Sequence, residues 1–213
     1  MQDARSMGWA RANHLPAEML DSVHGLNKRF LDLAAVGEGG PSPGVWRSEA
    51  RLGLTADVSA QLLPLSAAQK AAAADCPYAL FDLRFRDDAH WRTRLGDEGR
   101  WNVAEDEPVP VPRETFAFVS LAIFFAWHVA TAGRLASEWL LGMTDGTVAA
   151  FRAATIDSLP ALAATEAVHL TARWSTCPAY WGALAGAAAR PNPAGLRKVQ
   201  LYGLQLVAAA RLT

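Results

Sequence analysis

The sequence predicts an all-α protein made of two related helical halves, and three observations carry this prediction. Alanine, the best helix former, is abundant, whereas the strand formers Val and Ile are scarce. Apolar residues make up 51% of the chain and charged residues 19%, as expected for a folded chain with a core. The third observation is that the stretch RLGLTADVSAQLLPLS at 51–66 resembles LLGMTDGTVAAFRAAT at 140–155, which begins 89 residues later. We therefore predict two halves, residues 1–107 and 108–213, related by internal duplication.

The first predicted element is an amphipathic helix over residues 16–35. Apolar side chains recur there at spacings of three and four, which places them on one helix face. They are Met19, Val23, Leu26, Phe30 and Leu33. The glycine- and proline-rich segment at 37–44 is typical of a loop that ends such a helix.

Each copy of the repeated stretch is expected to form two short helices. Thr55 and Thr144 stand at the N-cap position of the first helix, and Ser66 and Thr155 at that of the second. Ser66 with Gln69 has the spacing of a capping box. Without any gap, the alignment also pairs Arg84 with Arg173, Phe85 with Trp174 and Leu95 with Leu184. The duplicated segments are thus predicted to be residues 52–95 and 141–184.

A long apolar helix is predicted after each copy, over 114–132 and 194–212, and we expect the halves to pack through these helices as a pseudo-dimer. The segment from Thr115 to Gly133 contains no Asp, Glu, Lys or Arg, and its length would suffice for one membrane span. We favour a central helix that its neighbours bury all round, with His128 hydrogen-bonded inside the core.

The order Leu-Gly-apolar-Thr, short helix, Ser/Thr cap, second helix and Arg-aromatic resembles the C-terminal part of the flagellar transcriptional activator subunit FlhD. The matching positions in the second half are Leu141, Gly142, Met143, Ala149, Thr155, Leu162, Ala163, Arg173 and Trp174. Those in the first half are Leu52, Gly53, Leu54, Leu65, Ser66, Arg84 and Phe85.

This resemblance implies a small all-helical regulator that activates transcription together with a partner subunit, and here one chain would supply both halves of a two-fold interface. Direct DNA binding is not favoured, although it stays open. The net charge is −1, and Asp145 and Asp157 stand at the expected helix starts, where they would repel phosphate.

Three acid-x-x-His pairs are the only pattern that indicates metal chemistry: Asp21/His24, Asp87/His90 and Glu166/His169. Residues at i and i+3 share a helix face, and helical bundles use such pairs as metal ligands. The alternative function is therefore a helical metalloprotein that uses Glu166/His169 and a second acid–His pair. We favour ordinary surface pairs, and we expect no metal or cofactor.

No phosphate-binding loop, dinucleotide motif or nucleophile elbow occurs, so nothing indicates an enzyme. Cys76 and Cys177 do not make a disulfide framework, and we expect a cytoplasmic protein. Eight tryptophans are many for this length, and several stand near expected connectors, where they would suit a protein interface. We therefore predict a non-enzymatic regulatory or adaptor protein. Its partner would contact Arg84, Trp91, Trp101, Arg173, Trp174 and Trp181.

Overall fold

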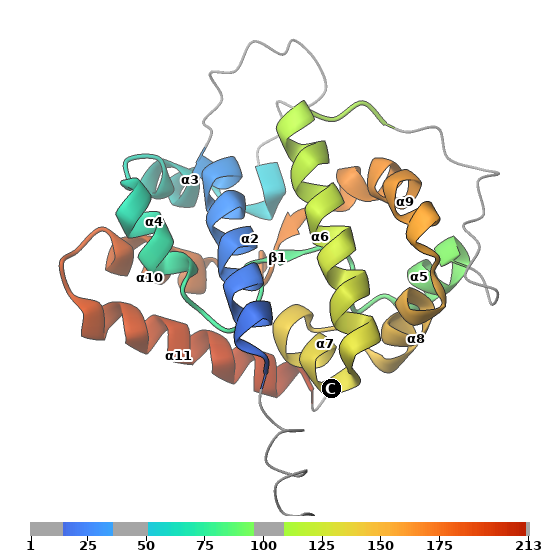
Figure 1. Ribbon diagram of the computed structural model, residues 1–213. Coiled ribbons are helices and arrows are strands. Elements are labelled where there is room, and N and C mark those ends of the chain that lie inside the picture. The colour runs from blue at the N-terminus through green and yellow to red at the C-terminus, as the bar shows by residue number, and fades with distance from the viewer. Residues whose placement is uncertain (1–14, 36–50, 96–108, 212–213) are drawn as a thin grey trace, which may run out of the picture.

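The computed structural model describes residues 15–35, 51–95 and 109–211, and this part of the chain is mostly helical (Figure 1). It contains ten α-helices, and the one sheet consists of two strands of two residues each. The prediction of an all-α fold is confirmed. Trp101 and most of the predicted connector before Pro112 lie outside the described residues, as does the boundary between 107 and 108.

The elements follow one another in two series. The first series is α2 (Ala17–Ala35), the 3-10 turn η1 (Arg51–Gly53), α3 (Ala56–Leu62), α4 (Ala67–Ala74), β1 (Phe81–Asp82) and α5 (Asp88–Leu95). The second is α6 (Arg113–Ala132), α7 (Arg134–Leu141), α8 (Asp145–Ala153), η2 (Ile156–Ser158), α9 (Leu159–Glu166), η3 (Ala167–His169), β2 (Thr171–Ala172), α10 (Pro178–Ala188) and α11 (Pro193–Ala210).

Three of the four predicted N-caps are present. The hydroxyls of Thr55 and Thr144 accept from backbone N–H groups in the first turns of α3 and α8, and Ser66 forms the capping box with Gln69. The prediction for Thr155 is wrong. Its side chain caps nothing, because the chain passes through the 3-10 turn η2 before α9 begins at Leu159.

The two series exchange their short helices. Helix α5 packs on α8, and α10 packs on α3 and α4, so each series contributes a helix to the other. Strands β1 and β2 form an antiparallel pair in which Phe81 lies opposite Ala172 and Asp82 opposite Thr171. Figure 1 shows this pair behind α2 and α6, which run side by side across the front of the molecule.

Structurally equivalent positions of the two series do not keep one spacing along the chain. The N-caps Thr55 and Thr144 have the spacing of the repeated stretch, whereas the bends after the strands are one residue further apart. Arg84 and Trp174 occupy these bends, each with a φ of 56°. The carbonyls of Arg84 and Arg173 nevertheless accept from the indoles of Trp91 and Trp181, so the ungapped pairing of Arg84 with Arg173 stays a prediction.

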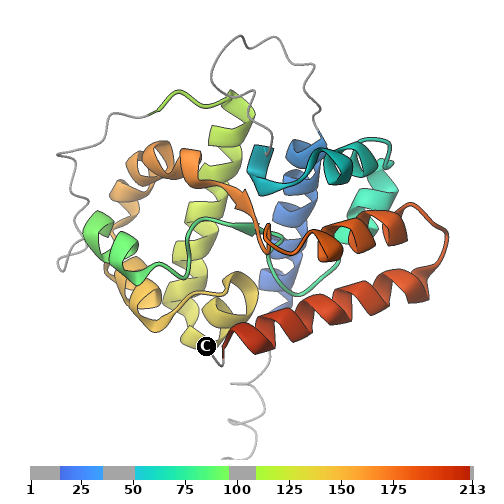
Figure 2. The same cartoon turned by 180° about the vertical axis from the view of Figure 1, so that it is seen from behind.

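The expectation that the halves pack through the two long apolar helices is also wrong. Helix α6 packs against α2, α7, α8 and α9, and α11 packs chiefly against α10, so the two long helices share no extensive contact. Figure 2 shows α11 lying beside α10 along the lower edge of the molecule. Helix α6 packs on α8 and α9, and α2 packs on α3 and α4.

The repeated Leu-Gly pair has a backbone reason. Gly142 ends α7 in the left-handed conformation with a φ of 74°, and Gly53 has a φ of 71°. A Cβ at Gly142 would also collide with the guanidinium group of Arg173, which packs against this turn. Glycine is required here by both conformation and space.

Candidate functional site

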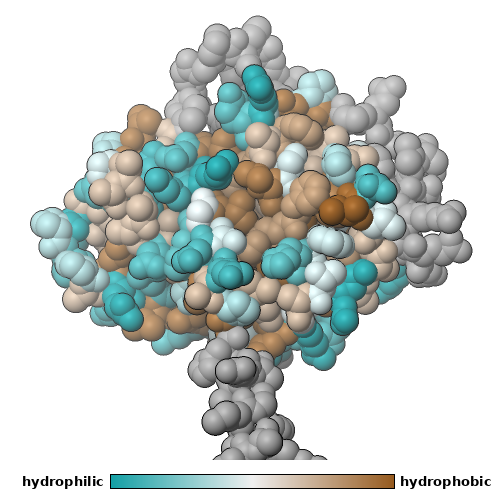
Figure 3. Space-filling model, viewed as in Figure 1, coloured by the Kyte–Doolittle hydropathy of each residue, from teal (hydrophilic) through white to brown (hydrophobic). Residues whose placement is uncertain are grey.

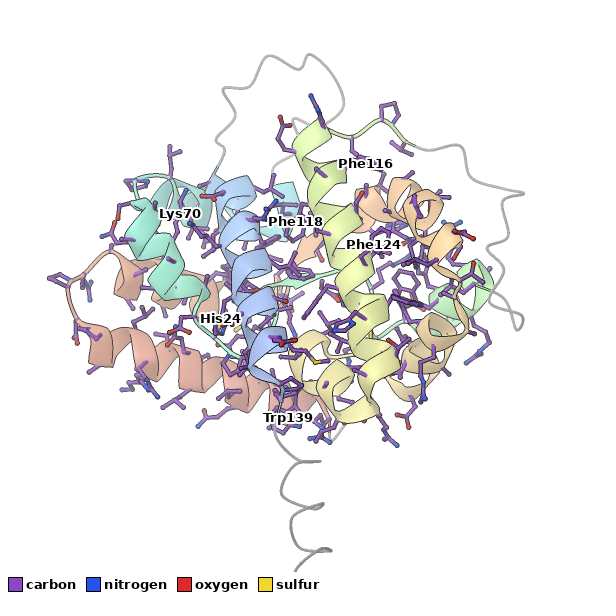
Figure 4. All side chains as sticks on the ribbon, viewed as in Figure 1. His24, Lys70, Phe116, Phe118, Phe124 and Trp139 are labelled. Carbon is purple, nitrogen blue, oxygen red and sulfur yellow. The ribbon has the colours of Figure 1, made fainter. Side chains whose placement is uncertain are left out.

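The outward face of α6 exposes several large apolar side chains. Phe116, Leu121 and Phe124 are exposed to 39%, 43% and 38% of their full areas, although each is a large hydrophobic side chain. No charged residue occurs between Thr115 and Gly133 to break this face. Figure 3 shows hydrophobic residues gathered near the centre of this side, where α6 lies, and Figure 4 labels Phe116 and Phe124 along the helix. Below, we call Phe116, Leu121 and Phe124 the α6 surface.

Helix α6 is thus not buried all round, as the sequence indicated, because only its inner side meets α2, α8 and α9. His128 lies exposed and not in the core. By length and composition alone α6 could cross a membrane, and 44% of its most apolar window is buried inside the protein.

The predicted partner-binding residues divide into buried and accessible ones. Trp91 and Trp181 are fully buried, and each indole N–H donates to a backbone carbonyl, that of Arg84 and of Arg173 respectively, at 2.9 Å. Arg173 is buried too and donates to the carbonyl of Leu140. These three residues hold the core together, and their burial removes them from any surface that a partner could contact.

The other predicted residues remain accessible to different degrees. Arg84 is exposed. Trp174 is half-buried and packs edge-on against Tyr78 and Tyr180, with the guanidinium group of Arg173 over its ring. Neither residue lies on α6. The sequence signal for the α6 surface was the run without charge from Thr115 to Gly133, which alone does not distinguish a buried helix from a half-exposed one.

A second candidate site joins two of the acid-x-x-His pairs. His90 projects from α5, Glu166 from the end of α9, and His169 from η3, with one potential ligand atom from each lying within 4.8 Å of the others. His90 Nε2 is 2.8 Å from Glu166 Oε2. The sequence singled out both pairs, but the exchange of α5 onto the second series is what brings His90 to Glu166.

Glu166 is fully buried, which is unusual for a carboxylate in a protein interior. Arg94 Nε lies 3.1 Å from Glu166 Oε1, yet this oxygen accepts no hydrogen bond of good geometry. Arg84 Nη1 lies 3.2 Å from His90 Nδ1. Since a guanidinium group can only donate, Nδ1 is the acceptor, and the His90 proton then stands on Nε2 and points at Glu166. Burial lowers the pKa of His169 below its usual value, so this imidazole is neutral at pH 7.

The corresponding place beside α10 contains two tyrosine hydroxyls and a thiol, with the buried guanidinium group of Arg173 close to them. Tyr180 precedes Trp181 as His90 precedes Trp91, and its hydroxyl lies 3.1 Å from that of Tyr78. Tyr78 in turn donates to the carbonyl of Gln200 at 2.9 Å. Cys76 is buried beside them, and burial raises the pKa of its thiol to about 12, which keeps it protonated and unreactive.

No protein-family model, curated protein or solved structure matches this chain. The resemblance to the FlhD family and the kinship that it would imply stay predictions.

Proposed function

We propose that this chain is a non-enzymatic adaptor, built as an internal duplication, which binds a protein partner through the α6 surface. The observation that supports this proposal is a row of large apolar side chains on a face without charge. A soluble protein rarely keeps such a face without a binding role. Aromatic and aliphatic side chains on a rigid helix are also the usual anchors of protein interfaces.

The occupant that fits the α6 surface best is an apolar helix of another protein. Helix α6 offers ridges at positions 116, 120, 124 and 128, against which a second helix can pack. A second copy of this chain fits less well. An antiparallel pair of α6 helices would bring Glu114 near Arg134, but Arg134 already pairs with Glu138 and Asp145, each at 2.6 Å.

A membrane surface is also less suitable. Helix α2 lies beside α6 on the same side of the molecule, and its exposed face mixes the acidic Glu18, Asp21 and Asp32 with the basic Lys28 and Arg29, so it offers no basic rim. Anionic lipid headgroups attract basic rims and repel carboxylates.

The experiment compares capture of proteins from a lysate of the native host by three forms of the tagged chain. They are the wild type, the double variant Phe116→Glu/Phe124→Lys, and a control on α2 that changes exposed charges, Asp21→Lys/Lys28→Glu. We expect one protein to be retained in stoichiometric amount by the wild type and the control and lost with the α6 variant. Binding of that protein should then be reproduced with purified components.

Equal retention by the α6 variant would contradict the proposal. Self-association of the purified chain that the α6 variant abolishes, measured by analytical ultracentrifugation, would assign this surface to a second copy. Binding of the wild type to liposomes of anionic phospholipid would assign it to a membrane.

A further inference from the structure

We propose that His90, Glu166 and His169 form a zinc site that links α5 to the end of α9. Two imidazole nitrogens and one carboxylate oxygen are a ligand set that zinc uses where three protein groups leave a fourth position to water. This proposal is independent of the α6 surface, because none of the three residues lies on α6.

Zinc binding would require only a small movement of the three side chains. In a tetrahedral zinc site the donor atoms lie about 2.0–2.2 Å from the metal and hence roughly 3.3 Å from one another. The three potential ligand atoms here already lie within 4.8 Å. They come from α5, α9 and η3, and α5 is held in place by its packing on α8.

The state of Glu166 provides the second observation. Its carboxylate is fully buried and its Oε1 accepts no hydrogen bond, although nearly all buried polar atoms in proteins do. Its oxygen Oε1 has an ion-pair contact with Arg94 at 3.1 Å, and a metal ion would give the buried carboxylate the direct bond that this contact does not provide.

The comparison with α10 shows a different set of groups beside the corresponding tryptophan. Beside Trp181 stand the hydroxyls of Tyr78 and Tyr180, and the buried charge nearby is the guanidinium group of Arg173. A buried ion pair is often no more stabilising than apolar side chains of similar volume. Stability alone therefore gives no reason for a buried Glu with two histidines at this place.

Zinc binding would change one contact. If His90 binds zinc through Nε2, its proton must move to Nδ1, which then can no longer accept from Arg84. Arg84 is free to turn away because it is exposed and its Nε lies 3.8 Å from Asp87 Oδ2, a carboxylate that can hold it. Arg84 is thus a competitor of the metal, and its removal should strengthen binding.

The test measures zinc affinity of the purified, chelator-treated chain by competition with a chromophoric chelator, and Co²⁺ absorption reports the coordination geometry. We expect one ion per chain, tetrahedral Co²⁺ bands and a higher melting temperature with zinc. His169→Gln and His90→Gln should each lower the affinity at least about tenfold. His24→Gln, at a half-buried histidine that faces Asp75, is the matched control and should change nothing.

Arg84→Met keeps the aliphatic stem and should raise the affinity about tenfold, a gain that misfolding cannot produce. An unchanged affinity in this variant would overturn the assignment of His90 Nε2 as a ligand. The proposal as a whole fails if the wild type binds no zinc at micromolar concentration. It also fails if His24→Gln weakens binding as much as His169→Gln does.

Discussion

Helices α5 and α10 place a tryptophan in the same way, and the molecule surrounds the two indoles with different chemistry. Both helices begin three residues before a fully buried Trp whose N–H donates to a carbonyl at the preceding bend. The residue before Trp91 is His90, which meets the buried Glu166, whereas Tyr180 before Trp181 meets Tyr78. The shared part is what the fold requires, and the part that differs is where a function can reside.

Helices α2 and α6 differ in the same manner. Both bury one face against a pair of shorter helices, α3 with α4 and α8 with α9 respectively. The exposed face of α2 carries Glu18, Asp21, Lys28, Arg29 and Asp32, whereas that of α6 carries the three large hydrophobic side chains. A charged outer face is therefore compatible with this packing, so folding alone does not explain the apolar face of α6, on which the proposed binding role rests.

The largest loss of stability is expected from changing the feature that α5 and α10 share, the buried tryptophan. Trp91→Ala and Trp181→Ala should each lower the free energy of unfolding by about 3–5 kcal/mol, because each leaves a large cavity and an unpaired carbonyl. Urea unfolding followed by circular dichroism measures both. If only one of the two variants were destabilised by this amount, the two indoles would not have the same structural role.

The second largest loss of stability is expected from changing the groups beside Trp91, which differ from those beside Trp181. Glu166→Leu alone should cost about 3 kcal/mol in the metal-free chain, because it removes the buried carboxylate that pairs with Arg94 and His90. Adding His90→Tyr puts a hydroxyl where Tyr180 stands beside α10, and it should recover the part of the loss that comes from His90, although Arg94 keeps its charge. A double variant as unstable as the single one, in the same urea experiment, would show that the charged cluster is needed for packing.

The smallest loss of stability is expected from changing the first residues of α5 and α10. Asp88 Oδ1 accepts from the backbone N–H of Thr147 at 2.9 Å and from the hydroxyls of Thr144 and Thr147, so α5 helps to cap α8. Pro178 stands at the same place in α10 and accepts nothing with its side chain. We expect Asp88→Ala to cost about 1 kcal/mol and Pro178→Ala less.

The same contacts give the Asp88 effect a pH dependence. The hydrogen bond from Thr144 lowers the pKa of Asp88, so its stabilisation is complete above the unfolded pKa of 3.8 and disappears as the pH falls through the lower folded value. Thermal unfolding between pH 5 and pH 2.5 should show the difference between wild type and Asp88→Ala shrinking on acidification. A difference that stayed constant would assign the effect to helix propensity.

The local elements were predictable from the sequence because their causes are local. The apolar spacing from Met19 to Leu33 predicts α2, and the hydroxyl of Thr55 predicts the start of α3. The packing of α5 on the second series and of α10 on the first was not predictable. Neither helix has a strong amphipathic pattern that would indicate which face is buried. For the same reason the sequence presented Trp91 and Trp181 as surface residues, and it presented Asp87/His90 and Glu166/His169 as separate pairs.

The exchange of short helices also has a consequence for how the chain acquires its structure during synthesis. Until α8 has left the ribosome, α5 has no surface on which to dock, and α3 waits longer still for α10. The β1–β2 pair likewise joins segments far apart in the sequence, which slows folding because a long loop must close first. Until α10 is made, the apolar side chains of α3 and α4 that it covers stay exposed on the growing chain, where they can associate with other chains.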